Sequence, residues 1–91
     1  MVKQENIYNY HTHETESCKL HVYTWEFAKI IIDDYMFENR RTCEVMLLDR
    51  SVGFFETELN ADDAYRRCVS ILNIFMAENI ATFASFLFDQ L

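Results

Sequence analysis

The sequence predicts an α+β fold of order ββαββα, in which two β-hairpins pack on one amphipathic helix and one long, strongly apolar C-terminal helix. Three observations predict this class. β-branched and aromatic side chains, which are typical of strands, are concentrated in 6–13 and 18–24. Apolar residues recur at helical spacing over 25–39 and again over 61–90. Over 43–47 they alternate with polar residues, as in a half-buried strand.

The first predicted hairpin joins strands 6–13 and 18–24 through the polar loop 14–17. From Thr24 the period changes to that of a helix over 25–39, which the Thr24 side chain would cap. Its apolar positions lie three or four residues apart, and they are Phe27, Ala28, Ile31, Ile32, Tyr35 and Met36. We expect this amphipathic helix to cover one face of a sheet.

A second hairpin is predicted from strands 43–49 and 54–59, joined by residues 50–53. Gly53 is the single glycine of the chain, and we expect it to adopt the special backbone conformation that the turn requires. Asn60 is a favoured residue type for a helix N-cap, and carboxylates follow it in the first turn. The last helix is therefore expected to begin directly after Asn60.

The last predicted helix, 61–90, has more apolar surface than a small sheet can cover. As one straight helix it would be about 45 Å long, whereas a compact chain of this size is roughly 30 Å across. It must either protrude or break near Glu78–Asn79, where Asn79 would cap a second helix. We expect another chain, either a copy or a partner, to cover the remainder. The expected oligomer-interface residues are Leu72, Phe75, Met76, Phe83 and Phe86.

Residues 68–88 have the length of a membrane span, so a tail anchor is an alternative to the soluble helix. Glu78, Asn73 and Asn79 lie near the middle of this segment, where polar groups are most costly in a bilayer. The strands upstream also need this helix as their cover. We therefore expect no membrane association, and the absence of a signal-peptide pattern at the N-terminus predicts a cytoplasmic location.

All three histidines and one of the three cysteines lie in 11–21, which raises the question of a metal site. The predicted loop places His13 opposite Cys18 and leaves His11, His13 and Cys18 on one face of the hairpin, with His21 on the other. A zinc site that used all four side chains would need a broken strand. We therefore predict no metal site, and His11, His13 and Cys18 remain weak candidates.

The sequence carries no catalytic or cofactor signature. It has neither a nucleophile elbow nor a metalloprotease motif, and one glycine among 91 residues cannot form a phosphate-binding loop. Arg41 near Cys43 and Arg67 beside Cys68 would favour a thiolate, but the apolar neighbours of both cysteines favour packed, reduced thiols. We expect one domain, 1–91, that is not an enzyme and binds no cofactor.

Acidic residues dominate the charge of the chain. The formal net charge is -7, and between residues 26 and 63 ten carboxylates stand against four basic side chains. This balance disfavours direct binding to nucleic acid, and the two arginine doublets are expected to be solvated. The ordinary explanation is solubility, but carboxylates on a rigid fold also resemble the phosphates of a nucleic acid. The predicted partner-binding acidic face comprises Asp33, Asp34, Glu56, Glu58, Asp62 and Asp63.

These features together predict a small acidic protein-binding module of the inhibitor or immunity type that acts by contact. Its partner would be a protein, and charge mimicry suggests one that binds nucleic acid. The composition gives the impression of a phage or mobile-element product. One alternative is a structural or regulatory subunit that forms homo-oligomers through its last helix. Another is a small metal-binding protein that uses His11, His13 and Cys18.

Overall fold

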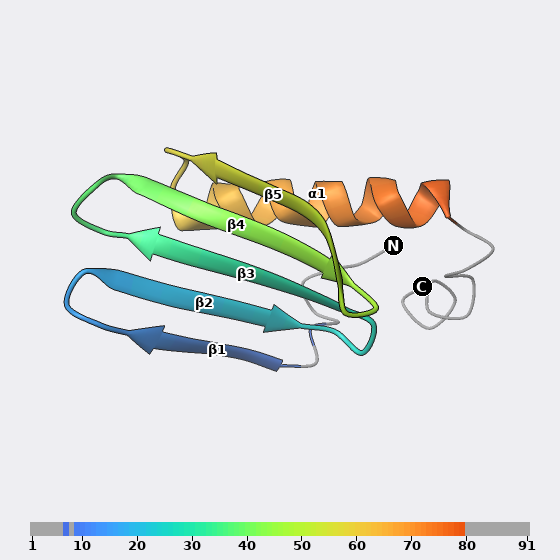
Figure 1. Cartoon of the computed structure of the whole chain (residues 1–91), viewed down its shortest axis with the longest axis horizontal. Coiled ribbons are helices and arrows are strands. Elements are labelled where there is room, and N and C mark those ends of the chain that lie inside the picture. Colours follow the sequence, from blue (N-terminus) through green and yellow to red (C-terminus); the bar gives the residue numbers. More distant parts are fainter. Residues whose placement is uncertain (1–6, 8, 80–91) are drawn as a thin grey trace.

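The computed structural model describes residue 7 and residues 9–79, and within them one antiparallel sheet is followed by one helix (Figure 1). The sheet has five strands, and each strand pairs with its neighbour in the sequence. The elements are β1 (Asn9–Glu14), β2 (Cys18–Thr24), β3 (Ala28–Tyr35), β4 (Arg40–Leu47), β5 (Arg50–Thr57) and α1 (Ala61–Glu78). The chain is therefore α+β as predicted, but the predicted order ββαββα is wrong.

The predicted helix over 25–39 is wrong because this segment forms a turn and strand β3. Ala28, Ile30 and Ile32 are buried, and the residues between them are more exposed, which is the period of a strand. The run Ile30 to Ile32 satisfies a helical and a strand period at once, so spacing alone does not separate the two. β-branched side chains favour the strand, and in it Ile30 and Ile32 are both 0% exposed.

The second hairpin turns earlier than predicted. Leu48 and Asp49 form its two-residue turn, with φ angles of 49° and 63°, the left-handed pair that matches strand twist. Gly53, which was expected in the turn, lies within β5 instead. A Cβ atom added to Gly53 would lie 3.4 Å from Cγ2 of Ile71, an ordinary contact distance, so this position of β5 faces α1.

The first hairpin forms nearly where it was predicted. The backbone N–H of Thr15 donates to the carbonyl of Cys18 at 2.8 Å and closes the loop. His13 pairs with Leu20 and His11 with Val22, so the predicted opposition of His13 and Cys18 is wrong by two residues. Because side chains alternate with period two, this shift leaves His11, His13 and Cys18 on the same face, as expected.

The core lies between α1 and one face of β3, β4 and β5. The helix contributes side chains spaced three or four residues apart, and they are Ala64, Tyr65, Cys68, Leu72 and Met76. Within the described residues, no helix or strand covers the other face of the sheet, which we call the open face. It carries the alternate residues of each strand, including His11 and His13 on β1 and Asp33 on β3.

Two of the predicted oligomer-interface residues belong to this core. Leu72 and Met76 are 0% exposed within a single chain, where they pack against its own sheet. Phe75 is partly buried against the same core. The wide apolar surface of the helix is thus largely used by the sheet of its own chain, because the sheet has one strand more than the sequence suggested.

Helix α1 ends at Glu78, the position of the predicted break. The backbone N–H of Asn79 donates to the carbonyl of Met76 at 3.1 Å, and its side-chain amide donates to the carbonyl of Phe75 at 2.9 Å. The expected interface residues Phe83 and Phe86 lie outside the described residues. No helix within 9–79 is both long enough and apolar enough to cross a membrane.

The buried stripe of α1 predicts a difference between two apolar residues of the same helix. Replacing Leu72, which is 0% exposed, by Ala should lower the free energy of unfolding by about 3 kcal/mol, because it leaves a cavity. Replacing Ile74, which is 60% exposed, by Ala should cost less than about 1 kcal/mol. Urea unfolding followed by circular dichroism measures both changes. Equal losses would mean that α1 docks through another face.

Candidate functional site

The carboxylates predicted to bind a partner lie at one end of the sheet, where β3 and β5 end and α1 begins (left side of Figure 1). Strand pairing brings Asp34 beside Arg41, and Arg41 beside Thr57. The β3–β4 turn adds Glu38, which sequence reasoning missed because its position depends on that turn. We call this set the acidic end, and its members are Asp33, Asp34, Glu38, Glu56, Glu58, Asp62 and Asp63.

The acidic end does not form the single face that was predicted. Asp33 and Glu56 both lie on the open face, with Thr42 between them in the register. Asp34 points to the helix side, because successive residues of a strand point to opposite sides of a sheet. Asp62 and Asp63 lie in the first turn of α1. The carboxylates therefore wrap around the end of the sheet.

Arg41 fixes the interior of the acidic end and was missed as a functional residue. Its Nε donates to Oδ1 of Asp34 at 2.9 Å, and the two side chains are only 12% and 14% exposed. Its Nη1 donates to the carbonyls of Glu58 at 3.2 Å and Leu59 at 2.9 Å. Arg41 is thus not the solvated residue that was expected. It joins β3 to the loop that leads into α1.

Asn60 caps α1 as predicted. Its Oδ1 accepts a hydrogen bond from the backbone N–H of Asp63 at 2.8 Å, and its side-chain amide donates to Oδ2 of Asp63 at 3.2 Å. Asp62 and Asp63 also lie where the helix dipole favours negative charge. Asp63 therefore has a structural role, whereas its neighbour Asp62 is exposed and takes no part in the cap.

A shallow hollow of about 370 Å³ opens at the acidic end and is lined by Glu38, Arg40, Glu56, Thr57 and Glu58. The guanidinium of Arg40 lies 3.5 Å from Glu38 and 3.7 Å from Glu56, and it stacks 4.1 Å from the ring centre of Tyr35. The two glutamate side chains are 59% and 60% exposed, so these ion pairs are weak and exchangeable. Three carboxylates around one cation leave the hollow negative.

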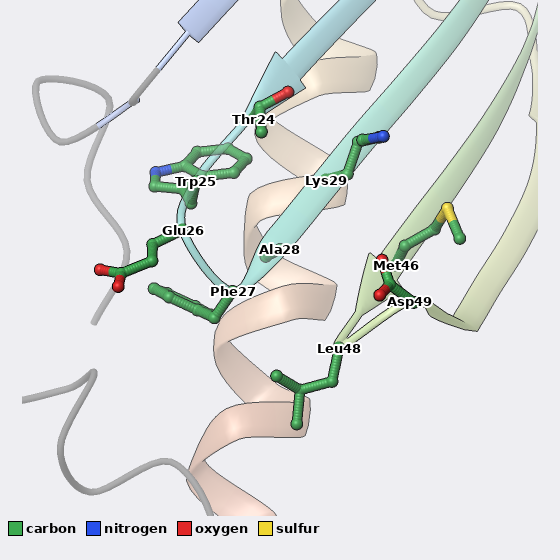
Figure 2. Close-up of a pocket in the computed structure, with 9 residues that line it drawn as sticks. All are labelled: Thr24, Trp25, Glu26, Phe27, Ala28, Lys29, Met46, Leu48 and Asp49. Atoms are coloured by element: carbon green, nitrogen blue, oxygen red, sulfur yellow. The ribbon is translucent and has the colours of Figure 1, made fainter.

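A second hollow, of about 280 Å³, lies at the opposite end of the sheet between the β2–β3 and β4–β5 turns (Figure 2). Trp25, Phe27 and Leu48 are among its lining residues. Figure 2 shows the carboxylate of Glu26 and the ammonium of Lys29 pointing in opposite directions. A site for catalysis or for a charged ligand needs polar groups that converge on one point. This hollow is therefore the weaker candidate.

The weak metal candidates do not assemble a site within one chain. His11 and His13 are exposed on β1, and Cys18 is half-buried at the start of β2. Among the described residues, no group of three or more His, Cys, Asp or Glu side chains is arranged to hold a metal ion. His11 and His13 nevertheless lie on the open face of the sheet, two residues apart on the same strand.

The remaining cysteines are packed, as the sequence suggested. Cys43 and Cys68 are both 0% exposed and not joined by a disulfide. A hydrogen bond between their side chains lowers the pKa of Cys43, whereas the same bond together with burial raises the pKa of Cys68. Because neither sulfur is accessible, the pair stabilises the contact of β4 with α1 and offers no accessible nucleophile.

Five rings line the helix side of β1 and β2, and we call them the aromatic ladder: Tyr10, His21, Tyr23, Trp25 and Tyr65. The ring of Tyr23 lies 4.6 Å from that of Tyr10 and 4.1 Å from that of Tyr65. Burial raises the pKa of Tyr65 to about 12 and raises that of Tyr23 as well. The phenols therefore stay neutral, which suits an apolar layer.

His21 is the polar member of the ladder. It is 8% exposed, and its Nδ1 lies within hydrogen-bonding distance, 3.0 Å, of the Tyr10 hydroxyl. Its Nε2 is buried and finds no hydrogen-bond partner among the described residues. Burial, followed by the charge of Lys19, lowers the pKa of His21 below its usual value of 6.5. The imidazole is therefore held in its neutral form.

No protein-family model, no curated protein and no solved structure matches this chain. Asp34 stabilises the fold through its ion pair with Arg41, and Asp63 takes part in the cap of α1. The carboxylates of Glu38, Glu56, Glu58 and Asp62 are on exposed residues and surround the hollow at the acidic end or lie near it.

The Arg41 contacts predict that the two members of the arginine doublet differ in their effect on stability. Arg41→Met should lower the free energy of unfolding by about 2 kcal/mol, because it leaves Asp34 half-buried without its partner. Arg40→Met should cost at most about 1 kcal/mol, since its ion pairs are exposed. Urea unfolding of both variants measures the difference. Adding Asp34→Asn should recover part of the Arg41→Met loss, and no recovery would contradict the pairing.

The lowered pKa of His21 predicts how stability depends on pH. Below pH 6.5 the unfolded chain binds a proton at His21 before the folded chain does, so the free energy of unfolding falls as the pH falls through this window. In the His21→Phe variant the free energy of unfolding should change less steeply between pH 7 and pH 5, because the contribution of at most about one proton to the slope is removed. Urea unfolding at several pH values compares the two proteins. An unchanged slope would show that His21 titrates normally.

Proposed function

We propose that this chain is a small protein-binding module whose acidic end contacts a basic surface of another protein. The observation that carries the proposal is that carboxylates distant in the sequence converge in space. Carboxylates from three separate places in the sequence, 33–38, 56–58 and 62–63, meet at one end of the molecule. The end of a sheet and the start of a helix hold them on rigid elements, which suits a surface that works by contact.

Solubility alone is a poorer explanation of this arrangement. Net charge keeps a protein soluble wherever it lies on the surface, and scattering lowers the repulsion between like charges. Here like charges are concentrated, so each adds to the repulsion of the others. A cationic partner would relieve that repulsion on binding. The contact carboxylates that we propose are Glu38, Glu56, Glu58 and Asp62, because the fold does not use them.

The finer form of the proposal is an inhibitor or immunity-type protein that imitates the charge of a nucleic acid. Arg40 supports this form, since its ion pairs with Glu38 and Glu56 are exposed and a partner's cations can replace it there. The partner would then be a protein with a phosphate-binding surface, and duplex DNA or RNA should compete with the module for it. Homo-oligomerisation through α1 ranks second, because Leu72 and Met76 are already buried.

A pair of matched charge-reversal variants tests the proposal. The acidic-end variant is Glu56→Lys/Glu58→Lys/Asp62→Lys, and the control at the opposite end is Glu26→Lys/Asp49→Lys/Glu78→Lys. Both change the net charge equally, so nonspecific electrostatic effects should be the same. A partner captured from extracts of the source organism by the wild type should also bind the control. Its affinity for the acidic-end variant should fall at least about tenfold.

Calorimetry with the purified partner gives the second measurement. Raising the salt from 50 to 300 mM should weaken binding of the wild type steeply, because exposed charges are screened. The acidic-end variant should show a shallower salt dependence than the control. Equal affinity of the partner for both variants would overturn the acidic end as the contact surface. Competition by duplex DNA separates the nucleic-acid mimic from a general acidic module.

A further inference from the structure

Strand β1 is an edge strand with nothing paired to its outer side among the described residues. All six of its residues are exposed. Edge strands of monomeric proteins are commonly protected by Lys, Pro or a bulge. β1 has the sequence Asn-Tyr-His-Thr-His-Glu and pairs with β2 without a register shift, so it has none of these protections. Its outer side can accept another strand.

The hydrogen-bond pattern of the first hairpin shows which backbone groups point outward. The N–H of Thr15 donates to the carbonyl of Cys18, so residues 15 and 18 form a hydrogen-bonded pair. Such pairs alternate along antiparallel strands, which directs the backbone groups of His13 and His11 toward β2. The backbone N–H and C=O of Thr12 therefore point away from the sheet, as do those of Tyr10 and Glu14.

The side chains of His11 and His13 both lie on the open face, about 6.8 Å apart along the strand. Their neighbours across the hairpin, Val22 and Leu20, have no atom that binds a metal. One chain thus presents two imidazoles and no third ligand. Zinc takes four ligands in a tetrahedron, so this half-site is complete only if two more imidazoles are supplied.

A second copy of the chain supplies them by simple symmetry. If two β1 strands pair about a two-fold axis, directly opposite residues must lie on the same face of the joined sheet. The outward bonds of Thr12 allow it to pair with Thr12 of the second copy at that axis. This register places His11 opposite His13 of the second copy, and His13 opposite His11 of the second copy. The four imidazoles then occupy a rectangle of about 5 by 7 Å on the open face.

Charge favours a metal ion at this position. Glu14 is the one acidic side chain of β1, and in this register it lies opposite Tyr10 of the second copy, so the two glutamates do not face each other. Each chain nevertheless has a formal net charge of -7, which opposes association. A divalent cation between the copies offsets part of this repulsion, and imidazole nitrogens are ligands that zinc prefers.

We propose that Zn²⁺ joins two copies of this chain edge to edge through β1, bound by His11 and His13 of each copy. The product is a ten-stranded sheet with both helices on the same side. The site does not exist in one chain and is complete in two. This interaction uses neither the hollow of the acidic end nor α1, so it goes beyond the proposed function and stands independently of it.

Zinc titration of the purified full chain tests the proposal. Without metal and with EDTA present, sedimentation velocity should show a monomer. Adding Zn²⁺ should convert it to a dimer, with the change complete at about one ion per two chains by calorimetry. EDTA should return the monomer, and Mg²⁺ should have no effect because it prefers oxygen ligands. One zinc ion bound per monomer, or a dimer that persists in EDTA, would overturn the proposal.

Variants at three positions separate the metal ligands from the strand pairing. His11→Ala and His13→Ala should each weaken zinc-dependent dimerisation at least about tenfold, because each removes two of four ligands. Thr12→Pro keeps both histidines and removes only an outward N–H, which an edge strand tolerates, yet it should also abolish the dimer. Thr12→Val, the matched control, should dimerise normally. Circular dichroism checks that each variant folds, and full dimerisation of the His11→Ala/His13→Ala variant would overturn the proposal.

Discussion

The packing of the whole structure depends on one constraint: a single helix must cover a sheet that is wider than the helix. Five strands spaced about 4.8 Å apart make a sheet roughly 19 Å wide, whereas a helix with its side chains is about 10 Å across. Helix α1 therefore lies over β3, β4 and β5. β1 and β2 need a different cover on the same side. The aromatic ladder provides it, since Tyr65 extends from α1 toward Tyr23.

The division of the cover between α1 and the aromatic ladder also explains where polar groups are buried. The ladder carries hydroxyl, imidazole and indole groups into a place where large rings are needed to fill space. His21 Nε2, Trp25 Nε1 and Tyr65 Oη are buried without a hydrogen-bond partner among the described residues. Each of these atoms has a desolvation cost. Ile30, Ile32 and Leu72, which meet under α1 in the same core, carry no such polar group and are buried without this cost.

The sequence predicted the fold class, the first hairpin and the start of α1, because each depends on local chemistry that a single segment carries. Asn60 is an example, since a cap needs only its own helix. β3 was missed because three consecutive isoleucines fit two periods, and only pairing with β2 and β4 decides between them. The Leu48–Asp49 turn was missed because leucine rarely takes a positive φ, and Gly53 was available as a more obvious turn residue.

The candidate site was predicted in part for the same reason. Its carboxylates can be found from charge alone, but the division of Asp33 and Asp34 between the two sides of the sheet depends on their lying in strand β3. Arg41 could not be singled out, because its partners Asp34, Glu58 and Leu59 come together only through the fold. The burial of Leu72 and Met76 within one chain could not be predicted either, because it depends on strand β3 of their own sheet.

The simple order of the strands has a consequence for the chain as it is being made. Each strand pairs with the one before it, so a nascent chain on the ribosome can add hairpin to hairpin without closing a long loop. The helix that shields Ile30, Ile32 and Val45 is synthesised after every strand. Until it emerges, the sheet has a bare apolar side, and this is the interval in which a chaperone would find a binding surface.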